Sequence, residues 1–392
     1  MKLREVSLDV IVYCIWIAAV LCAPLKVFPL LAIRLVALLA ILFMKRIDVR
    51  NIVIPTVSLI IYSFCFWGQN NYNADFFDPF NNYMKIISIF EIAIMCNGLY
   101  TTTHKTKKTI TKVALLSVFI SVITSLLYTL KDKEAIRYRG ADYKFIMGFY
   151  QFYGYILLAV SLTILIGYGI QHKKKINKLF IVLLSVIILM FSGRLTTGML
   201  LGLLGVFLGI YSIYTKKSRN LFLTLTILVG IFLIAKDFMA EIITYAISSF
   251  HIQGVVQKRL LTVVEMLSTG NLVDGYGSRG KLMMRSINSF LKHPLFGIGY
   301  SNYEQATVGC HSEWTDTLGV YGILGTFLIL LCFYSISNAC KKIIRDELGK
   351  KMFYLTLLLF VVLGFLNPSF ETPIMAIVFV IVPCLSYYFE EV

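Results

Sequence analysis

The sequence predicts an all-α, polytopic integral membrane protein with about 12 transmembrane helices and one long extracytoplasmic loop that contains amphipathic helices. Of its 392 residues, 58% are hydrophobic, and the mean hydropathy is +0.78. Only 15% are charged, whereas an ordinary soluble domain carries about 25%. Apolar runs of nearly membrane-spanning length recur along the chain, separated by short polar segments. These observations exclude a soluble fold.

The apolar runs define the expected spans in chain order. A hydrocarbon core of roughly 30 Å requires about 20 apolar residues per helix. The runs lie at 8–23, 27–44, 52–67, 83–99, 111–130, 148–170, 179–192, 196–214, 220–236, 313–336, 352–366 and 372–388. The first run follows a short basic start without a small-residue cleavage site, so we expect a retained helix rather than a removed signal peptide. The chain therefore divides into residues 1–236 with nine spans, the loop 237–312, and residues 313–392 with three spans.

The segment 237–312 is long for a connection between spans, and long ordered connections tend to carry function. Within it, 256–268 and 281–292 repeat apolar residues at helical spacing, on either side of the turn-rich stretch 268–278. We expect these two segments to be amphipathic helices that lie against the outer, membrane-facing surface of the bundle.

Small residues recur in the expected span 196–214. Gly198, Gly202, Gly205 and Gly209 follow one another at spacings of three and four residues. Glycines at this spacing allow two helices to approach closely in a membrane. We therefore expect the glycine face of this span to pack against neighbouring helices.

The distribution of charge predicts the orientation of the chain. Placing the N-terminus in the cytoplasm puts 21 of the 37 Lys and Arg residues on that side, against seven acidic residues, an excess of +14. The outer loops are nearly neutral, and positive charge marks the cytoplasmic side of membrane proteins. Both termini are therefore expected in the cytoplasm. The net charge of +16 is explained by membrane insertion, and no nucleic-acid partner is expected.

The usual signatures of metal and nucleotide chemistry are absent from the sequence. It contains no Asp-x-Asp, His-Glu-x-x-His, Gly-x-Ser-x-Gly or Cys-x-x-Cys motif. Gly275 to Lys281 has the spacing of a phosphate loop, but Leu282 stands where a Ser or Thr would bind magnesium. We therefore expect neither a metal site nor a cofactor.

Arginines are the first group of candidate functional residues. Arg194 lies in a tight outer turn between two expected spans, where a charge is costly unless it has a role or snorkels to the interface. Arg279 and Arg285 lie around the start of an expected amphipathic helix, and either could instead belong to a solvated face. Arg34 lies within the second span, where pairing with Glu91 would make it structural.

His311 is the candidate base. It ends the long loop where the chain re-enters the membrane, and Glu313 and Asp316 follow within about one turn. Either carboxylate could orient its ring and support general-base catalysis, although an interfacial histidine can also be a hydrogen-bonded structural group. The outer residues His251 and His293 are weaker candidates, because their neighbours are less suited to support a base. His293 precedes a proline in a helix-terminating context.

Arginines and a histidine on one face of a membrane fit a particular chemistry. Guanidinium groups bind phosphate oxygens in pairs and stay charged without a metal, as a pyrophosphate ligand requires. A nearby histidine could deprotonate a hydroxyl that attacks the sugar carbon attached to that phosphate. These features suggest glycosyl transfer from a polyprenyl diphosphate outside the membrane.

Three stretches of the sequence resemble motifs of the O-antigen polymerase and O-antigen ligase family of bacterial envelope glycosyltransferases. Residues 192–194 are similar to the family's Ser-Arg turn between consecutive spans. Residues 278–299 resemble its arginine-bearing helix followed by His-Pro-Leu-x-Gly-x-Gly. Residues 311–325 resemble its histidine entry to a helix with Tyr-Gly-Ile-x-Gly.

This resemblance implies a donor-diphosphate role for Arg194 and Arg279, and an acceptor-activating role for His311. The pattern of Asp316 with Tyr321-Gly322 resembles the polymerase branch of this family more than its ligase branch. A polymerase would join the growing glycan to the next lipid-linked repeat unit and release undecaprenyl diphosphate. The implied location is the bacterial cytoplasmic membrane with the site facing outward. The implied partners are the undecaprenyl-diphosphate-linked donor and acceptor, membrane lipid, and a flippase and chain-length regulator of the same pathway.

Two other functions remain open from the sequence. A ligase would move the finished glycan to a lipid A core by the same chemistry. A transporter or flippase also suits 12 spans with buried ions such as Arg34 and Glu91. A transporter would be expected to show paired Gly/Pro interruptions near the bilayer midplane in two halves, and the sequence shows none.

Overall fold

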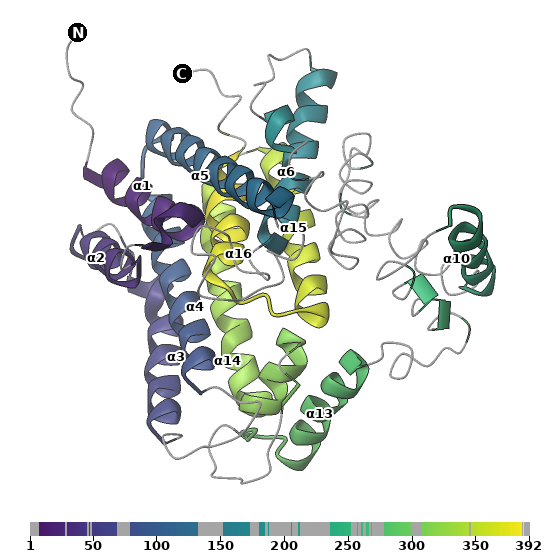
Figure 1. Ribbon diagram of the computed structural model, residues 1–392. Coiled ribbons are helices and arrows are strands. Elements are labelled where there is room, and N and C mark those ends of the chain that lie inside the picture. Colours follow the sequence, from purple (N-terminus) through teal and green to yellow (C-terminus); the bar gives the residue numbers. More distant parts are fainter. Residues whose placement is uncertain are drawn as a thin grey trace.

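The computed structural model describes residues 8–27, 30–44, 47, 49–68, 79–131, 152–172, 180–184, 236–251, 278–298, 311–344 and 346–385, with positions 187, 205, 211, 257, 260, 261, 264, 265, 268, 308, 309 and 387. Every regular element among these residues is a helix (Figure 1). The predicted all-α class is confirmed over this part of the chain.

Five helices in the described ranges are long and apolar enough to cross a membrane. They are α4 (Pro79–Tyr100), α5 (His104–Lys131), α6 (Phe152–Gln171), α14 (Glu313–Ile343) and α15 (Glu347–Leu366). Shorter apolar helices accompany them: α1 (Leu8–Leu21), α2 (Leu30–Phe43), the middle of α3 (Val49–Gly68), and the run Thr372–Leu385. A turn, η1 (Ala23–Val27), joins α1 to α2. This is the architecture of a multi-pass membrane protein.

The count of 12 spans stays a prediction. The expected spans 179–192, 196–214 and 220–236 lie largely outside the described residues. Gly205 is described, and a Cβ there would lie 2.4 Å from Val160 Cγ2 and 2.9 Å from Leu359 Cδ1. The close packing predicted for this glycine is therefore confirmed against α6 and α15.

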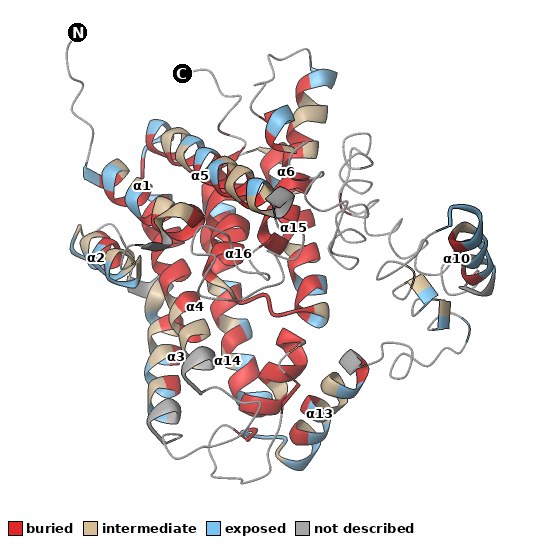
Figure 2. Ribbon diagram, in the orientation of Figure 1, coloured by how far each residue is buried: buried red, intermediate tan, exposed pale blue. Residues whose placement is uncertain are grey.

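The core of the bundle lies where α4, α14, α15 and the last helical run meet (Figure 2). An aromatic cluster fills the space between them. The ring centroids of Phe333 lie 5.0 Å from Phe370 and 5.6 Å from Phe379, and Trp314 lies 5.1 Å from Phe370. Phe360 of α15 joins the same cluster, 5.8 Å from Phe333 and 5.5 Å from Phe379, so these large apolar side chains pack α14 and α15 against the last run.

The last expected span, 372–388, is an interrupted helix. It consists of α16 (Thr372–Ala376), a π-helical stretch η2 (Ile377–Ile381) and α17 (Val382–Leu385). Pro383 has no N–H to donate to the carbonyl of Phe379, and its ring disfavours the regular helix there. The Sγ atoms of Cys96 and Cys340 donate to that carbonyl instead, each at 3.1 Å. Neighbouring helices thus satisfy the freed backbone group, as a membrane interior requires.

The long loop contains helices at both predicted segments. α13 (Ser278–Lys292) covers the predicted 281–292, and the positions described in 256–268 are helical. A further helix, α10 (Lys236–Ser249), was not predicted and begins at the expected boundary between span and loop. α13 lies at the end of the bundle where α14 begins (Figure 1).

A turn after α13 is inserted into a kink of α14. Gly322 interrupts α14 with φ 63° and ψ −166°, and Gly297 in the turn has φ 69°. The amide of Ile323 donates to Pro294 O at 2.8 Å, and the carbonyl of Gly319 accepts from Ile298 N at 3.0 Å. These are the two groups that would bond each other in a regular helix, so the turn replaces the bond that the kink breaks.

Candidate functional site

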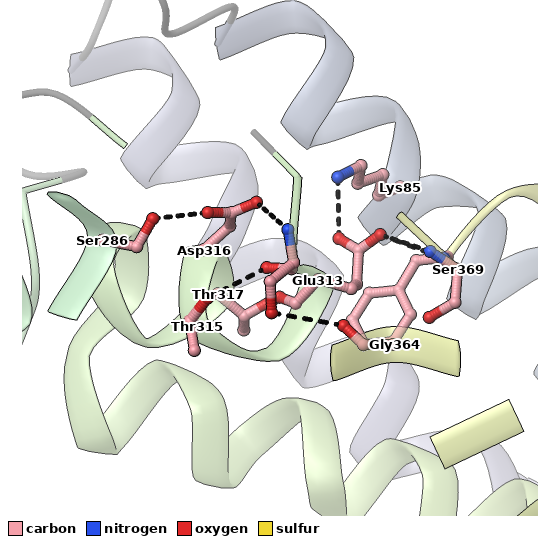
Figure 3. Close-up of polar contacts among 10 residues, drawn as sticks. Lys85, Ser286, Glu313, Thr315, Asp316, Thr317, Gly364 and Ser369 are labelled. Atoms are coloured by element: carbon pink, nitrogen blue, oxygen red, sulfur yellow. Dashed lines mark hydrogen bonds and ion pairs between the residues drawn. The ribbon is translucent and has the colours of Figure 1, made fainter. Parts of the chain in front are cut away.

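The first turn of α14 holds a buried, hydrogen-bonded group of charges (Figure 3). Glu313 is 2% exposed, and its Oε1 accepts from Lys85 Nζ of α4 at 2.7 Å. Its Oε2 accepts from the backbone amides of Ser369 at 2.8 Å and Phe370 at 3.1 Å. Glu313 therefore connects α14 both to α4 and to the segment that enters α16.

Asp316 connects the same turn to α13. Its Oδ1 accepts from Ser286 Oγ at 2.5 Å, and its Oδ2 accepts from the amide of Ser312 at 3.0 Å. The amide of Gly309 in turn donates to Ser286 Oγ at 2.8 Å. Two carboxylates at a helix N-terminus are also favoured by the helix dipole. The end of the long loop is thereby fixed between α13 and α14.

The contacts of these charges explain how they can be buried. An unpaired ion in a low-dielectric interior is costly, whereas an ion with a partner and further hydrogen bonds is tolerated. Glu313 has a cation and two amides, and Asp316 has a hydroxyl and an amide. The cluster therefore connects the entry of the chain into α14 to the neighbouring helices.

Arg34 and Glu91 form a second buried pair, as the structural alternative for Arg34 predicted. Arg34 contacts Glu91 through both Nε and Nη2, and Trp16 Nε1 donates to Glu91 Oε1 at 2.5 Å. Arg34 Nη2 also donates to Thr372 Oγ1 at 2.8 Å. The pair joins α1, α2 and α4 to α16, which is a structural arrangement. The candidacy of Arg34 as a residue that supports the functional site stays a prediction.

The structure brings two of the three candidate stretches together. His311 is half-buried and precedes Ser312, whose amide binds Asp316. Arg285 is exposed on α13 and precedes Ser286, which binds the same carboxylate. Arg279 lies in the first turn of α13, and its side chain lies outside the described residues. Arg194 also lies outside them.

The carboxylates near His311 have clear contacts of their own. Both oxygens of Glu313 and both oxygens of Asp316 bind the partners given above. These contacts position the start of α14 and the residue that precedes it. The direct support of the His311 ring by either carboxylate stays a prediction.

The other outer histidines lie at helix ends. His293 directly follows α13, and its amide donates to Ser289 O at 3.1 Å, which confirms the helix-terminating context predicted for it. His251 follows α10 with φ 48°. Both positions are consistent with the weaker candidacy of these residues.

Sequence reasoning missed Lys85 and Ser286 as members of the cluster. The sequence did indicate that Lys85 would have a partner, because it is a charged residue within an apolar span. Charged residues in such spans are almost always paired. Ser286 offered no signal, since serine is common on amphipathic helices. Within the described ranges, no group of three or more His, Cys, Asp or Glu residues is placed to hold a metal ion.

No protein-family model matches the chain, and no curated protein matches it. The fold and the site therefore define a class only, a multi-pass helical membrane protein with a charged cluster at one end of its bundle.

Proposed function

We propose that the chain is a bacterial surface-polysaccharide polymerase, acting on O-antigen or capsule. It transfers the growing glycan from undecaprenyl diphosphate to a hydroxyl of the next lipid-linked repeat unit. The reaction takes place at the outer face of the cytoplasmic membrane and is metal-independent. The donor and acceptor are both undecaprenyl-diphosphate-linked oligosaccharides that a flippase supplies. A chain-length regulator limits the length of the polymer.

The observation that carries this proposal is the junction between α13 and α14. Ser286 and Asp316 hold together the helix that bears Arg279 and Arg285 and the helix entry that bears His311. A glycosyl transfer from a diphosphate needs cations for the leaving group and a base for the acceptor in one site. The two stretches proposed to supply these groups, 278–299 and 311–325, meet at this junction.

The chemistry assigns a role to each group. The arginines Arg194, Arg279 and Arg285 bind the donor diphosphate through paired N–H donors and stabilise the charge that develops as it leaves. His311 takes the proton of the acceptor hydroxyl. The hydroxyl oxygen forms the new bond to the sugar carbon, the bond from that carbon to the diphosphate breaks, and undecaprenyl diphosphate departs with the electron pair.

The buried carboxylates act on the position of the base. Glu313 and Asp316 fix the first turn of α14 against α4, α13 and the entry to α16. A base must lie within hydrogen-bond reach of the proton that it removes, so contacts that fix the residues next to His311 suit this role.

Two alternatives share some of these features. A ligase that transfers the glycan to a lipid A core would use the same donor and the same base. A flippase or other transporter is favoured by the buried pair of Arg34 and Glu91, since charges inside the membrane often line transport pathways. The contacts of that pair with Trp16 and Thr372 instead tie helices together.

The glycan profile of a deletion strain separates the three functions. Loss of the electrophoretic ladder, with a single repeat unit retained, is the result expected for a polymerase. A polymerised glycan that is not attached to its lipid acceptor would mean a ligase. Loss of every surface repeat would mean a flippase, and an unchanged profile would exclude all three.

A further inference from the structure

The exposed face of α14 shows where lipid contact begins. Ile323, Phe327, Leu330 and Tyr334 are 49%, 57%, 47% and 63% exposed. They follow one another at spacings of three and four residues, which places them on one side of the helix. Before Gly322, the first two turns of α14 are buried almost throughout (Figure 2). The apolar stripe therefore starts at the kink.

The length of this stripe matches a bilayer. α14 has 31 residues, more than the roughly 30 Å of a hydrocarbon core requires, and Gly322 divides it into a short first part and a long second part. From Ile323 to Lys341 the helix rises about 27 Å. Lys341 and Lys342 are exposed in its last turn, where cations meet the membrane interface. The hydrocarbon core therefore ends near Gly322, and the first turns of α14 lie beyond it.

The turn after α13 lies at this boundary. The amides of Ile323 and Leu324 donate to Pro294 O at 2.8 Å and Leu295 O at 3.1 Å. Leu295 and Phe296 are 57% and 55% exposed, beside Ile323 and Leu324 at 49% each. Apolar side chains from the turn and from α14 thus form one continuous exposed surface.

The outer face of α13 is basic. Lys281, Arg285, Asn288 and Lys292 are all exposed, and their spacing of three to four residues places them on one side of the helix. The sequence of α13 contains no acidic residue. A basic face next to exposed apolar side chains is the arrangement of helices that lie in a membrane interface.

We infer that α13 and the turn 293–298 form an interfacial anchor that binds anionic phospholipid. Leu295 and Phe296 enter the acyl boundary of the leaflet on the α13 side, and Lys281 and Lys292 bind the phosphates of its headgroups. The two lysines bind phospholipid whether or not Arg285 binds a donor diphosphate, so the anchor is independent of the proposed function. It also places the Lys85–Glu313 cluster at the depth of the headgroups.

The proposed insertion of Leu295 and Phe296 into the leaflet is tested with a fluorescent amino acid introduced at position 296 of the full chain in nanodiscs. A second sample carries it at position 281. We expect a nitroxide placed near the top of the phospholipid acyl chain to quench the first probe strongly, and aqueous iodide to quench the second. Quenching of the probe at 296 by iodide but not by the lipid nitroxide would overturn the anchor.

The charged half is tested with the probe at position 288 and defined lipids that contain no polyprenyl diphosphate. Quenching by nitroxide-labelled phosphatidylglycerol is compared with quenching by the matching phosphatidylcholine. We expect the anionic lipid to bind preferentially, and the preference to fall about fivefold for each lysine removed in Lys281→Gln/Lys292→Gln.

The matched control is Lys281→Arg/Lys292→Arg, which keeps both charges and should keep the preference. Equal quenching by the two lipids in the parent chain would overturn the assignment to anionic headgroups. An undiminished preference for the anionic lipid in Lys281→Gln/Lys292→Gln would also overturn this assignment.

Discussion

His311 is the residue on which the proposed chemistry depends most, and its backbone position is set by its neighbours. Ser312 directly after it binds Asp316, and Glu313 binds Lys85. The proposed base therefore directly precedes the residues that fix the first turn of α14. Residues of the cluster should affect the stability of the fold, whereas His311 should affect the reaction.

The first prediction compares three histidines. His311→Gln keeps some hydrogen bonding but removes the base, and general-base catalysis is typically worth about 10²–10⁴-fold. We expect this variant to lose the polymer ladder, while His251→Gln and His293→Gln keep it, each at matched membrane abundance. A normal ladder from His311→Gln would show that the base has been assigned to the wrong residue.

The second prediction concerns the geometry of the arginines. Arg194→Lys and Arg279→Lys keep the charge but lose the two-pronged donor arrangement that phosphate oxygens accept. Both variants should yield shortened or absent polymer at normal protein level. Polymer of full length from both strains would remove these arginines from the diphosphate site.

The third prediction tests the buried pair at the start of α14. Lys85→Met leaves Glu313 buried without its cation, a change that typically costs about 3–5 kcal/mol. The double variant Lys85→Met/Glu313→Gln should recover part of this loss, because the Gln carbonyl can still accept from the amides of residues 369 and 370. Thermal unfolding in detergent measures both.

The matched control for this pair is Lys350→Met. Lys350 pairs with Glu347 at 2.6 Å on the surface, where an ion pair contributes little because water competes for both charges. We expect no measurable change in its unfolding temperature. A loss as large as that of Lys85→Met would mean that burial does not explain the effect.

Among the elements, the contact of α13 with the kink of α14 carries the most information. The two glycines Gly297 and Gly322 face each other, and a Cβ on either would lie within 2.6 Å of backbone atoms of the other segment. The backbone angles of Gly322 are accessible essentially to glycine alone. The kink and the turn therefore fit against each other at backbone distance, and a side chain at either glycine would separate them.

The fourth prediction follows from this contact. Gly322→Ala should destabilise the junction by about 1–3 kcal/mol from backbone strain alone, and the clash with Leu295 adds to it. We expect faster proteolysis between α13 and α14, measured by limited digestion in nanodiscs. Gly167→Ala in α6 is the control, since alanine favours a helix and should leave the digestion unchanged.

At the scale of the whole molecule, hydropathy predicted the spans because a helix that crosses a membrane must be apolar over a fixed length. Among the described residues, helices lie at nine of the expected spans, and five of these helices are long and apolar enough to cross a membrane. The last span is interrupted by a π-helical stretch. Pro383 is a sequence signal for that interruption, because proline disfavours a regular helix. The thiols that satisfy Phe379 O come from α4 and α14, and the sequence does not indicate them. Contacts between distant segments leave no periodic signal in a sequence.

Contacts between distant segments also limited what the sequence could predict of the candidate site. His311, Glu313 and Asp316 were found because charged residues stood out at the edge of an apolar run. The partners Lys85 and Ser286 come from other helices, and only the fold reveals them. The inserted turn was also invisible, since two glycines at 297 and 322 do not indicate that their backbones meet.

Orientation is the fifth prediction, and it is a property of the entire chain. The excess of positive charge on the side predicted to be cytoplasmic leads us to expect residues 237–312 outside. A membrane-impermeant thiol reagent should label a cysteine introduced at Asp274 in intact cells and should miss one at Lys174. The reverse pattern would contradict the outward-facing site.

The most direct test of the proposed polymerase is reconstitution of the purified chain with its own substrate. The lipid-linked repeat unit that accumulates in the deletion strain is added to the protein in nanodiscs, with a chelator present. The account predicts a ladder of polymers, release of undecaprenyl diphosphate, and neither product with His311→Gln. Unchanged repeat units with the parent chain, or a full ladder with His311→Gln, would contradict it.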